Sequence, residues 1–318
     1  MVQGMITCSN VSRSFRSVKK EPGLKGALRA LTSPIVTESH ALTDITTHIA
    51  SGAFIGLVGA NGAGKTSLLK ILSGLIPPSS GSVLVADENP FHRSKAFRKK
   101  IALVMGQKAQ LWWDLPALDA FDLICAIYEI EHKEYKKRLA LLTALLGVER
   151  HLHTQMRRLS LGERMKMELI GALLHWPDII FLDEPTIGLD VLAAEQLRIF
   201  LADFHREKKA TIILTSHNMD DIERLCERIL ILKDGALLLD SEKDTKIFLG
   251  KNSIRVLVRM REKPTLEHEI HADGRYIFST SRDDLPSFIS HLVSSSTITD
   301  LSIEEARLES LLTGIYKT

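Results

Sequence analysis

The sequence predicts an α/β protein built on a mostly parallel sheet. Short apolar runs such as "AFIGLVG", "DIIFLDE" and "ATIILTSH" alternate with stretches whose apolar residues recur at helical spacing. Within the runs the apolar residues are consecutive, which is typical of parallel strands covered by helices on both faces. Open parallel sheets bind ligands beyond the carboxyl ends of their strands. The residues that directly follow these runs are therefore the candidates for chemistry.

The pattern of the chain changes twice. Between residues 107 and 176 the strand signal fades, and stretches such as "LDAFDLICAIYEI" predict a helical subdomain inserted in the sheet domain. After about Asp240 a half-buried strand, "SIRVLVRM", precedes two predicted helices, "DDLPSFISHLVSS" and "SIEEARLESLLTGIYKT". We therefore expect a sheet domain over 1–240 and a small α+β accessory domain over 241–318.

Composition gives no reason to expect stable binding of nucleic acid. The 318 residues carry a formal charge of +2, and 25% of them are charged. Two basic clusters, Arg13 to Arg29 and Arg93 to Lys100, are interpreted as solvated faces or as contacts with anionic lipid or an acidic partner.

Cysteine spacing and hydropathy indicate the compartment. Cys8, Cys125 and Cys226 show no C-x-x-C pairing, which argues against a disulfide framework or a zinc site and fits a reducing cytosol. No apolar run approaches the roughly 20 residues that cross a bilayer, and no secretion signal precedes the first strand. We expect the chain by itself to be soluble.

A glycine-rich loop lies between a predicted strand and a helix. The segment "GANGAGKTS", residues 59–67, fits the phosphate-binding pattern G-x-x-x-x-G-K-S/T. Its glycines let backbone N–H groups surround phosphate oxygens, and the helix adds its positive end. Lys65 would place its charge against the β and γ phosphates, and Thr66 would offer its hydroxyl to Mg²⁺. The nucleotide-binding residues expected here are Asn61, Gly62, Ala63, Gly64, Lys65, Thr66 and Ser67.

Three other strand ends carry polar side chains. Asp183 ends a buried run and could hold Mg²⁺, while Glu184, kept extended by the proline after it, could point at an attacking water. His217 follows another run and could hydrogen-bond a γ-phosphate, although a lone histidine is more often structural. Gln107 also follows a strand, and its amide could ligate Mg²⁺ and order a water without adding charge.

The stretch "RRLSLGERMKMEL" predicts a capped helix that contains an unexpected glycine. Ser160 and Glu163 have the spacing of a capping box, in which each side chain bonds the other residue's backbone. Gly162, in the first turn, lowers helix stability. Either close packing or a ligand that approaches the backbone must account for it.

Together these motifs resemble an ATP-binding cassette ATPase. Seven elements occur in that family's order: a Walker A loop (59–66), a Q-loop (Gln107), a signature "LSLGE" (159–163), Walker B (179–183), Glu184, a D-loop ending at Asp190 and a switch His217. The phrases "VMGQKAQLWWDLPA" and "LSLGERMKMELIGALLHWPDIIFLDEPTIGLDV" are similar to ATPase subunits of bacterial exporters whose permease is a separate chain.

The resemblance implies an ATPase that uses ATP and Mg²⁺. The catalytic group it implies is Glu184, His217, Gln107 and Lys65, and the metal ligands are Thr66, Gln107 and Asp183. Ser160, Gly162, Glu163 and Asp190 would close over ATP held by the Walker loop of another subunit, which explains Gly162 as space for the γ-phosphate. Phe15 would stack on adenine, or else belong to the core. The common signature is L-S-G-G-Q, so Leu161 and Glu163 are departures that could alter the affinity of closure.

The implied partners are a second ATPase copy, or a paralogous one, and integral membrane permease subunits. A groove beside Gln107, bordered by Trp112 and Trp113, would accept a permease helix, with core packing as the other reading of either tryptophan. The chain would then lie at the cytoplasmic face of the cell membrane. The alternatives are a soluble cassette ATPase acting on nucleic acid or ribosomes, and a regulatory ATPase with low turnover.

Overall fold

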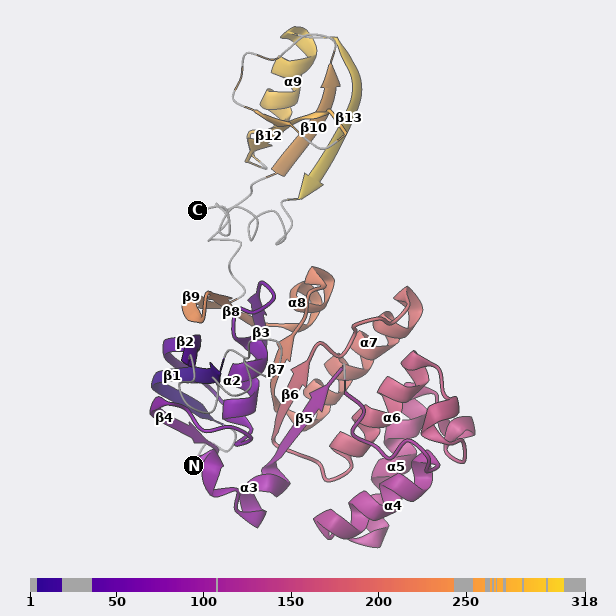
Figure 1. Cartoon of the computed structure of the whole chain (residues 1–318). Helices are drawn as coiled ribbons and strands as arrows, with labels where there is room; N and C mark the ends of the chain where they lie inside the picture. The colour runs from indigo at the N-terminus through magenta and orange to yellow at the C-terminus, as the bar shows by residue number, and fades with distance from the viewer. Residues whose placement is uncertain are drawn as a thin grey trace, which may run out of the picture. The chain divides into compact units, whose positions relative to one another are not determined.

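The computed structural model describes two compact units, Met1–Asp240 and Ser241–Thr318 (Figure 1). The described residues are 5–18, 36–106, 108–242, 254–260, 264, 266, 268–270, 273–281, 283–295 and 297–305. The first unit is an α/β fold whose larger sheet is mostly parallel, so the fold class predicted from the apolar runs is confirmed.

The larger sheet of the first unit has six strands in the order β5-β6-β7-β3-β8-β9. These strands are β3 (Phe54–Gly59), β5 (Ile101–Met105), β6 (Ile179–Asp183), β7 (Thr211–Thr215), β8 (Arg228–Lys233) and β9 (Ala236–Glu242). From β5 through β8 every neighbouring pair is parallel. The carboxyl ends of β3, β5, β6 and β7 therefore lie at one edge of the sheet.

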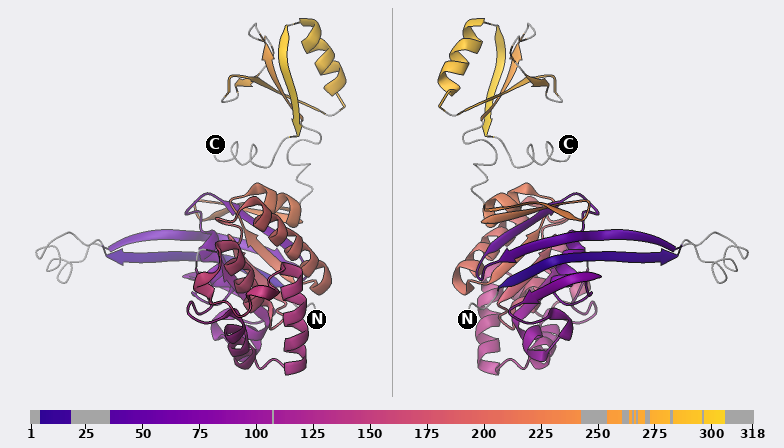
Figure 2. Two further views of the ribbon diagram at one scale, coloured as in Figure 1. Left: turned by 90° about the vertical axis from the view of Figure 1, so that its right-hand side faces the viewer. Right: turned by 90° about the vertical axis from the view of Figure 1, so that its left-hand side faces the viewer.

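A smaller antiparallel sheet, in the order β2-β1-β4, lies beside the larger one. It is formed by β1 (Ile6–Val18), β2 (Val36–Ile49) and β4 (Ser80–Val85). The helix α2 (Lys65–Leu72) contributes Leu69 to a core shared with Ile6 and Leu42 of the small sheet and Ile213 of the large one. Figure 2 shows β1 and β2 continuing together as a two-stranded arm beyond this core.

Helices complete the first unit. They are α3 (Lys95–Lys100), α4 (Ala117–Tyr128), α5 (His132–Leu146), α6 (Leu161–Leu173), α7 (Val191–Lys208) and α8 (Met219–Leu225), with short 3-10 turns at Pro90–His92, Glu149–His151 and Met156–Arg158. Over the described residues from 108 to 178 the chain forms helices and turns and no strand, and α4, α5 and α6 contact one another there.

The second unit has an antiparallel sheet in the order β11-β12-β10-β13 with one helix packed on it. Its elements are β10 (Ile254–Met260), β11 (Glu269–Ile270), β12 (Tyr276–Thr280), α9 (Leu285–Ser295) and β13 (Ile298–Glu305). Val256 and Phe278 of the sheet and Leu292 of α9 form its core. The prediction of a helix beginning at Ser302 is wrong for its first residues, because 302–305 belong to β13 and pair with β10. Residues 306–318, the rest of that predicted helix, lie outside the described part.

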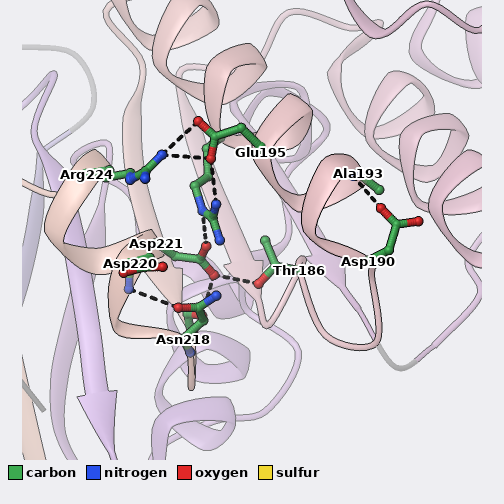
Figure 3. A network of polar contacts seen from close by, with 10 residues as sticks. Thr186, Asp190, Ala193, Glu195, Asn218, Asp220, Asp221 and Arg224 are labelled. Atoms are coloured by element: carbon green, nitrogen blue, oxygen red, sulfur yellow. Dashed lines mark hydrogen bonds and ion pairs between the residues drawn. The ribbon is translucent and has the colours of Figure 1, made fainter.

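A buried ion pair joins the two helices that follow β6 and β7. Asp221 of α8 is completely buried and accepts hydrogen bonds from Arg198 Nε of α7 (2.6 Å), Thr186 Oγ1 (2.5 Å) and Ser216 Oγ (2.6 Å). Figure 3 shows these groups converging, with Glu195 and Arg224 at their outer side. The segment after β6 and the segment after β7 are thereby fixed to each other.

Asp221→Ala should destabilise the fold strongly, because it removes the fully buried carboxylate that Arg198, Thr186 and Ser216 share and leaves the buried guanidinium with only the more exposed Glu195. We expect a loss of about 3–5 kcal/mol in the free energy of unfolding, measured by urea denaturation. The matched control is Arg206→Ala, which breaks an exposed pair with Asp203 and should cost at most about 1 kcal/mol. Equal losses in the two variants would show that the buried pair has no special role.

Candidate functional site

The carboxylate of Asp183, at the end of β6, is held from two sides. Thr66 Oγ1, at the start of α2, donates to Asp183 Oδ2 at 2.8 Å, and Thr215 Oγ1, at the end of β7, donates to Oδ1 at 2.7 Å. Thr66 and Asp183, which were each predicted to hold Mg²⁺, therefore lie in direct contact. Thr215 was not predicted, although its place just before "SH" at the end of an apolar run is a signal for it.

The glycine-rich loop is shaped by close contact with β2. Gly64 has φ of +104°, and a Cβ there would lie 2.4 Å from the carbonyl oxygen of Ala41, so only glycine fits. The helix α2 begins at Lys65 with no side-chain cap on its first N–H groups. Such uncapped groups at a helix start favour an anion. Asn61 and Gly62 are exposed at the loop tip, Ala63 is buried, and Ser67 is partly buried.

Lys65 is folded into the loop. Its Nζ donates to the carbonyl oxygens of Gly59 (2.7 Å) and Ala60 (3.1 Å), and the residue is only 6% exposed. Burial lowers the pKa of the Lys65 ammonium, while the carboxylates of Glu184 and Asp183 oppose this shift. A bound phosphate would stabilise the charged amine further.

Glu184 is turned toward His217. Glu184 Oε1 lies 2.7 Å from His217 Nε2, and the Glu184 side chain is 14% exposed. The expectation that the following proline keeps Glu184 extended is wrong, because its φ is +55°, in the left-handed region. The backbone N–H of Glu184 donates to the carbonyl oxygen of Thr215 at 3.0 Å, and this tie to β7 holds the residue in the uncommon conformation.

Gly106, at the end of β5, packs directly on the backbone of Glu184. A Cβ at Gly106 would lie 2.1 Å from the Glu184 carbonyl oxygen, and the Gly106 N–H donates to the Asp183 carbonyl oxygen at 2.8 Å. This contact was missed by the sequence reasoning, since nothing in the local pattern shows which segment faces a glycine. Gln107 itself lies outside the described residues, so its role stays a prediction.

The start of α6 forms a second group of predicted residues. The capping box is confirmed: Ser160 N–H donates to Glu163 Oε2 (2.9 Å), and Glu163 N–H donates to Ser160 Oγ (3.2 Å). The bond from the Ser160 N–H lowers the pKa of the Glu163 carboxyl. Gly162 has a packing reason, because a Cβ there would lie 3.2 Å from Ala193 Cβ at the start of α7.

Asp190 caps the neighbouring helix. Its Oδ1 accepts a hydrogen bond from the Ala193 N–H at 2.8 Å, as Figure 3 shows, and so begins α7 beside the start of α6. Apolar side chains are exposed around these two helix starts: Leu161, Ile187, Val191 and Leu192. A cavity of about 490 Å³ is lined by residues of this segment together with Glu184 and His217.

Phe15, predicted to stack on adenine or to belong to the core, lies on the arm opposite Ser39. It is 39% exposed, so it is not part of the hydrophobic core. The guanidinium of Arg13 lies over one face of its ring, 4.6 Å from the centroid.

A groove with a volume of about 290 Å³ lies between α3, α4 and α6. Leu103, Leu111, Trp112 and Tyr128 are among its lining residues. Trp112 and Trp113 are both close to half exposed, so neither is a core residue, and Arg164 lies over the ring of Trp113. Glu168, which the sequence reasoning did not select, is buried at the groove, where its carboxylate accepts hydrogen bonds from the N–H groups of Gln110 and Leu111.

The described residues contain no group of three or more His, Cys, Asp or Glu residues placed to hold a metal ion. No helix in the described ranges is both long and apolar enough to cross a membrane.

Comparison with known proteins gives one consistent family. The family model described as "ABC transporter" matches residues 42–187. The chain is 29% identical over 234 residues to the ABC transporter ATP-binding protein NatA of Bacillus subtilis, covering 74% of this chain and 88% of the relative. It is 31% identical to the energy-coupling factor transporter ATP-binding protein EcfA2 of Clostridium tetani (64% and 73% covered) and 28% identical to the methionine import ATP-binding protein MetN of Protochlamydia amoebophila (75% and 68% covered).

A solved structure of an ATP-binding subunit of an ABC transporter has the same fold. It aligns with a TM-score of 0.64 at 24% identity, over 77% of this chain and 93% of that chain. The sequence match to EcfA2 is above 30% identity over more than two thirds of that relative, and the residues of the family match include the loop at 59–67 and the Asp183–Glu184 pair. The chain therefore belongs to the ABC transporter family, as one of its ATPase subunits.

Proposed function

We propose that this ATPase subunit drives an exporter by closing around ATP together with a second copy or a closely related ATPase chain. One observation carries the proposal: Glu184 Oε1 lies 2.7 Å from His217 Nε2, beside the loop and helix start that can bind phosphates. In this arrangement a carboxylate is oriented next to the place where a terminal phosphate would lie. Glu184 can then order an attacking water, and His217 can hold Glu184 in place and contact the γ-phosphate.

The glycine-rich loop is the proposed binding site for the phosphates. Lys65, the loop N–H groups and the positive end of α2 would stabilise phosphate charge. The hydroxyl of Thr66 and the carboxylate of Asp183, 2.8 Å apart, are the oxygen ligands that Mg²⁺ takes in nucleotide sites, with Gln107 as the third proposed ligand. Mg²⁺, when bound, would neutralise charge on the phosphates.

The other side of the nucleotide would come from the partner copy. Ser160, Gly162 and Glu163 begin α6 at an exposed surface, where the remaining N–H groups of the first turn can meet a γ-phosphate. Exposed apolar side chains such as Val191 (81%) and Leu192 (77%) adjoin this helix start and suit an interface. Phe15 is proposed to stack on adenine. Asp190, which caps α7, is proposed to hold the start of that helix in place at the interface between the two chains.

Membrane subunits are the proposed recipients of this movement. The groove beside Trp112 offers apolar and aromatic side chains to a cytoplasmic helix of a permease, which would keep the chain at the cytoplasmic face of the membrane. Export as the direction is supported by the similarity of "VMGQKAQLWWDLPA" to exporter subunits. No feature of the described residues favours the rival function on nucleic acid or ribosomes, and the net charge of +2 argues against it.

Glu184→Gln tests the catalytic carboxylate. The amide keeps the size of the side chain but cannot accept a proton, so we expect the ATPase rate to fall at least about 100-fold while ATP still binds and the ATP-bound pair of chains persists longer. Rates come from phosphate release and the lifetime of the pair from size-exclusion chromatography. Glu207→Gln, at an exposed position of α7, is the matched control. Normal turnover in Glu184→Gln would contradict the proposal.

Ser160→Arg tests the contribution of the partner copy. The bulky cation should block closure on a nucleotide held by the other chain, so ATP affinity of the isolated chain stays at the wild-type value while hydrolysis falls about 100-fold or more. Affinity is measured by calorimetry and hydrolysis by phosphate release. Ser82→Arg, on an exposed strand position, adds the same side chain elsewhere. A wild-type rate in Ser160→Arg would place the phosphate clamp at another surface.

Gly106→Ala tests whether the end of β5 positions Glu184. A Cβ there would meet backbone atoms, which cannot move aside as a flexible side chain can, so Glu184 must shift. We expect kcat to fall about 10- to 100-fold with little change in ATP affinity, because the atoms that the new Cβ would meet belong to Glu184 and Ile187 and not to Lys65 or Thr66. Gly171→Ala is the control, since the nearest atoms to its Cβ would be side-chain atoms of Leu111, Ile124 and Phe121 rather than backbone atoms. If kcat were unchanged in Gly106→Ala, Glu184 would not depend on this contact.

A further inference from the structure

The basic cluster from Arg93 to Lys100 is divided between paired lysines and unpaired arginines. Lys95 and Lys99 both bind the carboxylate of Glu129, Lys99 at 3.0 Å, and Lys100 binds Glu88 at 2.7 Å. Glu129 follows α4 and Glu88 precedes α3, so these pairs tie α3 to its neighbours. Each of the three lysines therefore has a carboxylate partner in this chain, with Lys95 and Lys99 sharing one.

Arg93 and Arg98 are different. Both are exposed, both line the groove, and within the described ranges neither has a carboxylate partner. Three lysines within seven residues of Arg93 have a carboxylate partner, whereas the two arginines that line the groove have none. A shortage of carboxylates near this cluster therefore does not explain why the two arginines are unpaired; what they share is their place at the groove. An arginine fork is the side chain best suited to a carboxylate in two-point geometry.

Glu168 is the one carboxylate among the described residues that line the groove, so Arg93 and Arg98 leave the lining with a formal positive charge even when Glu168 is ionised. The Glu168 carboxylate is already used by the backbone N–H groups of Gln110 and Leu111, at 3.0 to 3.2 Å. A molecule that binds in the groove would therefore meet a net positive charge beside the apolar and aromatic side chains of Leu103, Trp112 and Tyr128. An occupant must offer apolar side chains to the lining and acidic ones to the rim.

We infer that the groove binds an acidic amphipathic helix of the membrane subunit, whose carboxylates pair with Arg93 and Arg98. This inference rests on the proposed function and adds the chemistry of the partner segment to it. The arginines would select the partner and guide its approach, because charges at the rim of an interface act mainly on specificity and on the rate of association. The apolar lining would supply most of the affinity.

The test is the double charge reversal Arg93→Glu with Arg98→Glu in the full-length chain. The probe is the membrane chain that remains bound to the tagged wild-type protein after detergent extraction. We expect the concentration of variant needed to retain half of that membrane chain to rise about tenfold, and the wild-type association, but not that of the variant, to weaken as salt increases. Lys136→Glu with Lys137→Glu makes the same change of charge at exposed positions of α5 outside the groove and should bind as the wild type does. Urea denaturation checks that both variants remain folded.

A second arm identifies the partner group. Once the bound membrane chain is sequenced, acidic residues in its cytoplasmic amphipathic segments are changed to arginine, and one such change should restore binding of the Arg93→Glu, Arg98→Glu variant. Unchanged binding by this variant, an equal loss in the α5 control, or no rescue by any partner reversal would overturn the inference. So would binding of the isolated wild-type chain to phosphatidylglycerol vesicles that the variant has lost, since the arginines would then serve lipid. If no membrane chain is retained by the wild type, it is the transporter function that fails.

Discussion

The carboxylate of Asp183 is the point on which the rest of the site depends. Thr66 and Thr215 hold its two oxygens, so the start of α2, the end of β6 and the end of β7 cannot move independently. Glu184 is the next residue, and its backbone is fixed by Thr215 on one side and by Gly106 on the other. The uncommon φ of Glu184 is therefore imposed by three strand ends, and it turns the carboxylate toward His217. A site of this kind is organised before nucleotide arrives, which is the condition for efficient electrostatic catalysis.

The same network extends away from the site. Asp221 joins Arg198 of α7 to Ser216, which lies beside His217, and Thr186 binds the same carboxylate from the segment after Glu184. That segment leads to Asp190 and to the starts of α6 and α7, where Gly162 packs against Ala193. The residues proposed to hold phosphate and those proposed to clamp it from a partner are thus connected through the buried bonds of Asp221 and through the exposed helix cap of Asp190. Movement at one is expected to be transmitted to the other as a shift of rigid elements.

The sequence was sufficient to predict those residues of the site that belong to a local pattern. Asp183 and His217 could be selected because they lie at or just after the end of an apolar run, and Lys65 because it belongs to the glycine-rich pattern. The Ser160 capping box is visible from its spacing. The extended conformation predicted for Glu184 was wrong because the effect of the proline after it is weaker than the contacts with Thr215 and Gly106, which come from distant segments. For the same reason the strand at Ser302 was taken for a helix, since its pairing with β10 is a tertiary interaction. Glu168 was overlooked because a carboxylate on a helix looks solvated until its backbone partners are known.

The central claim is that ATP is hydrolysed between two chains, each supplying what the other lacks. The most direct measurement is the ATPase rate per chain as a function of chain concentration, followed down to concentrations at which analytical ultracentrifugation finds only single chains. The account predicts that the rate per chain rises with concentration and approaches zero in the range where single chains predominate. A rate per chain that stays at its full value among single chains would contradict it.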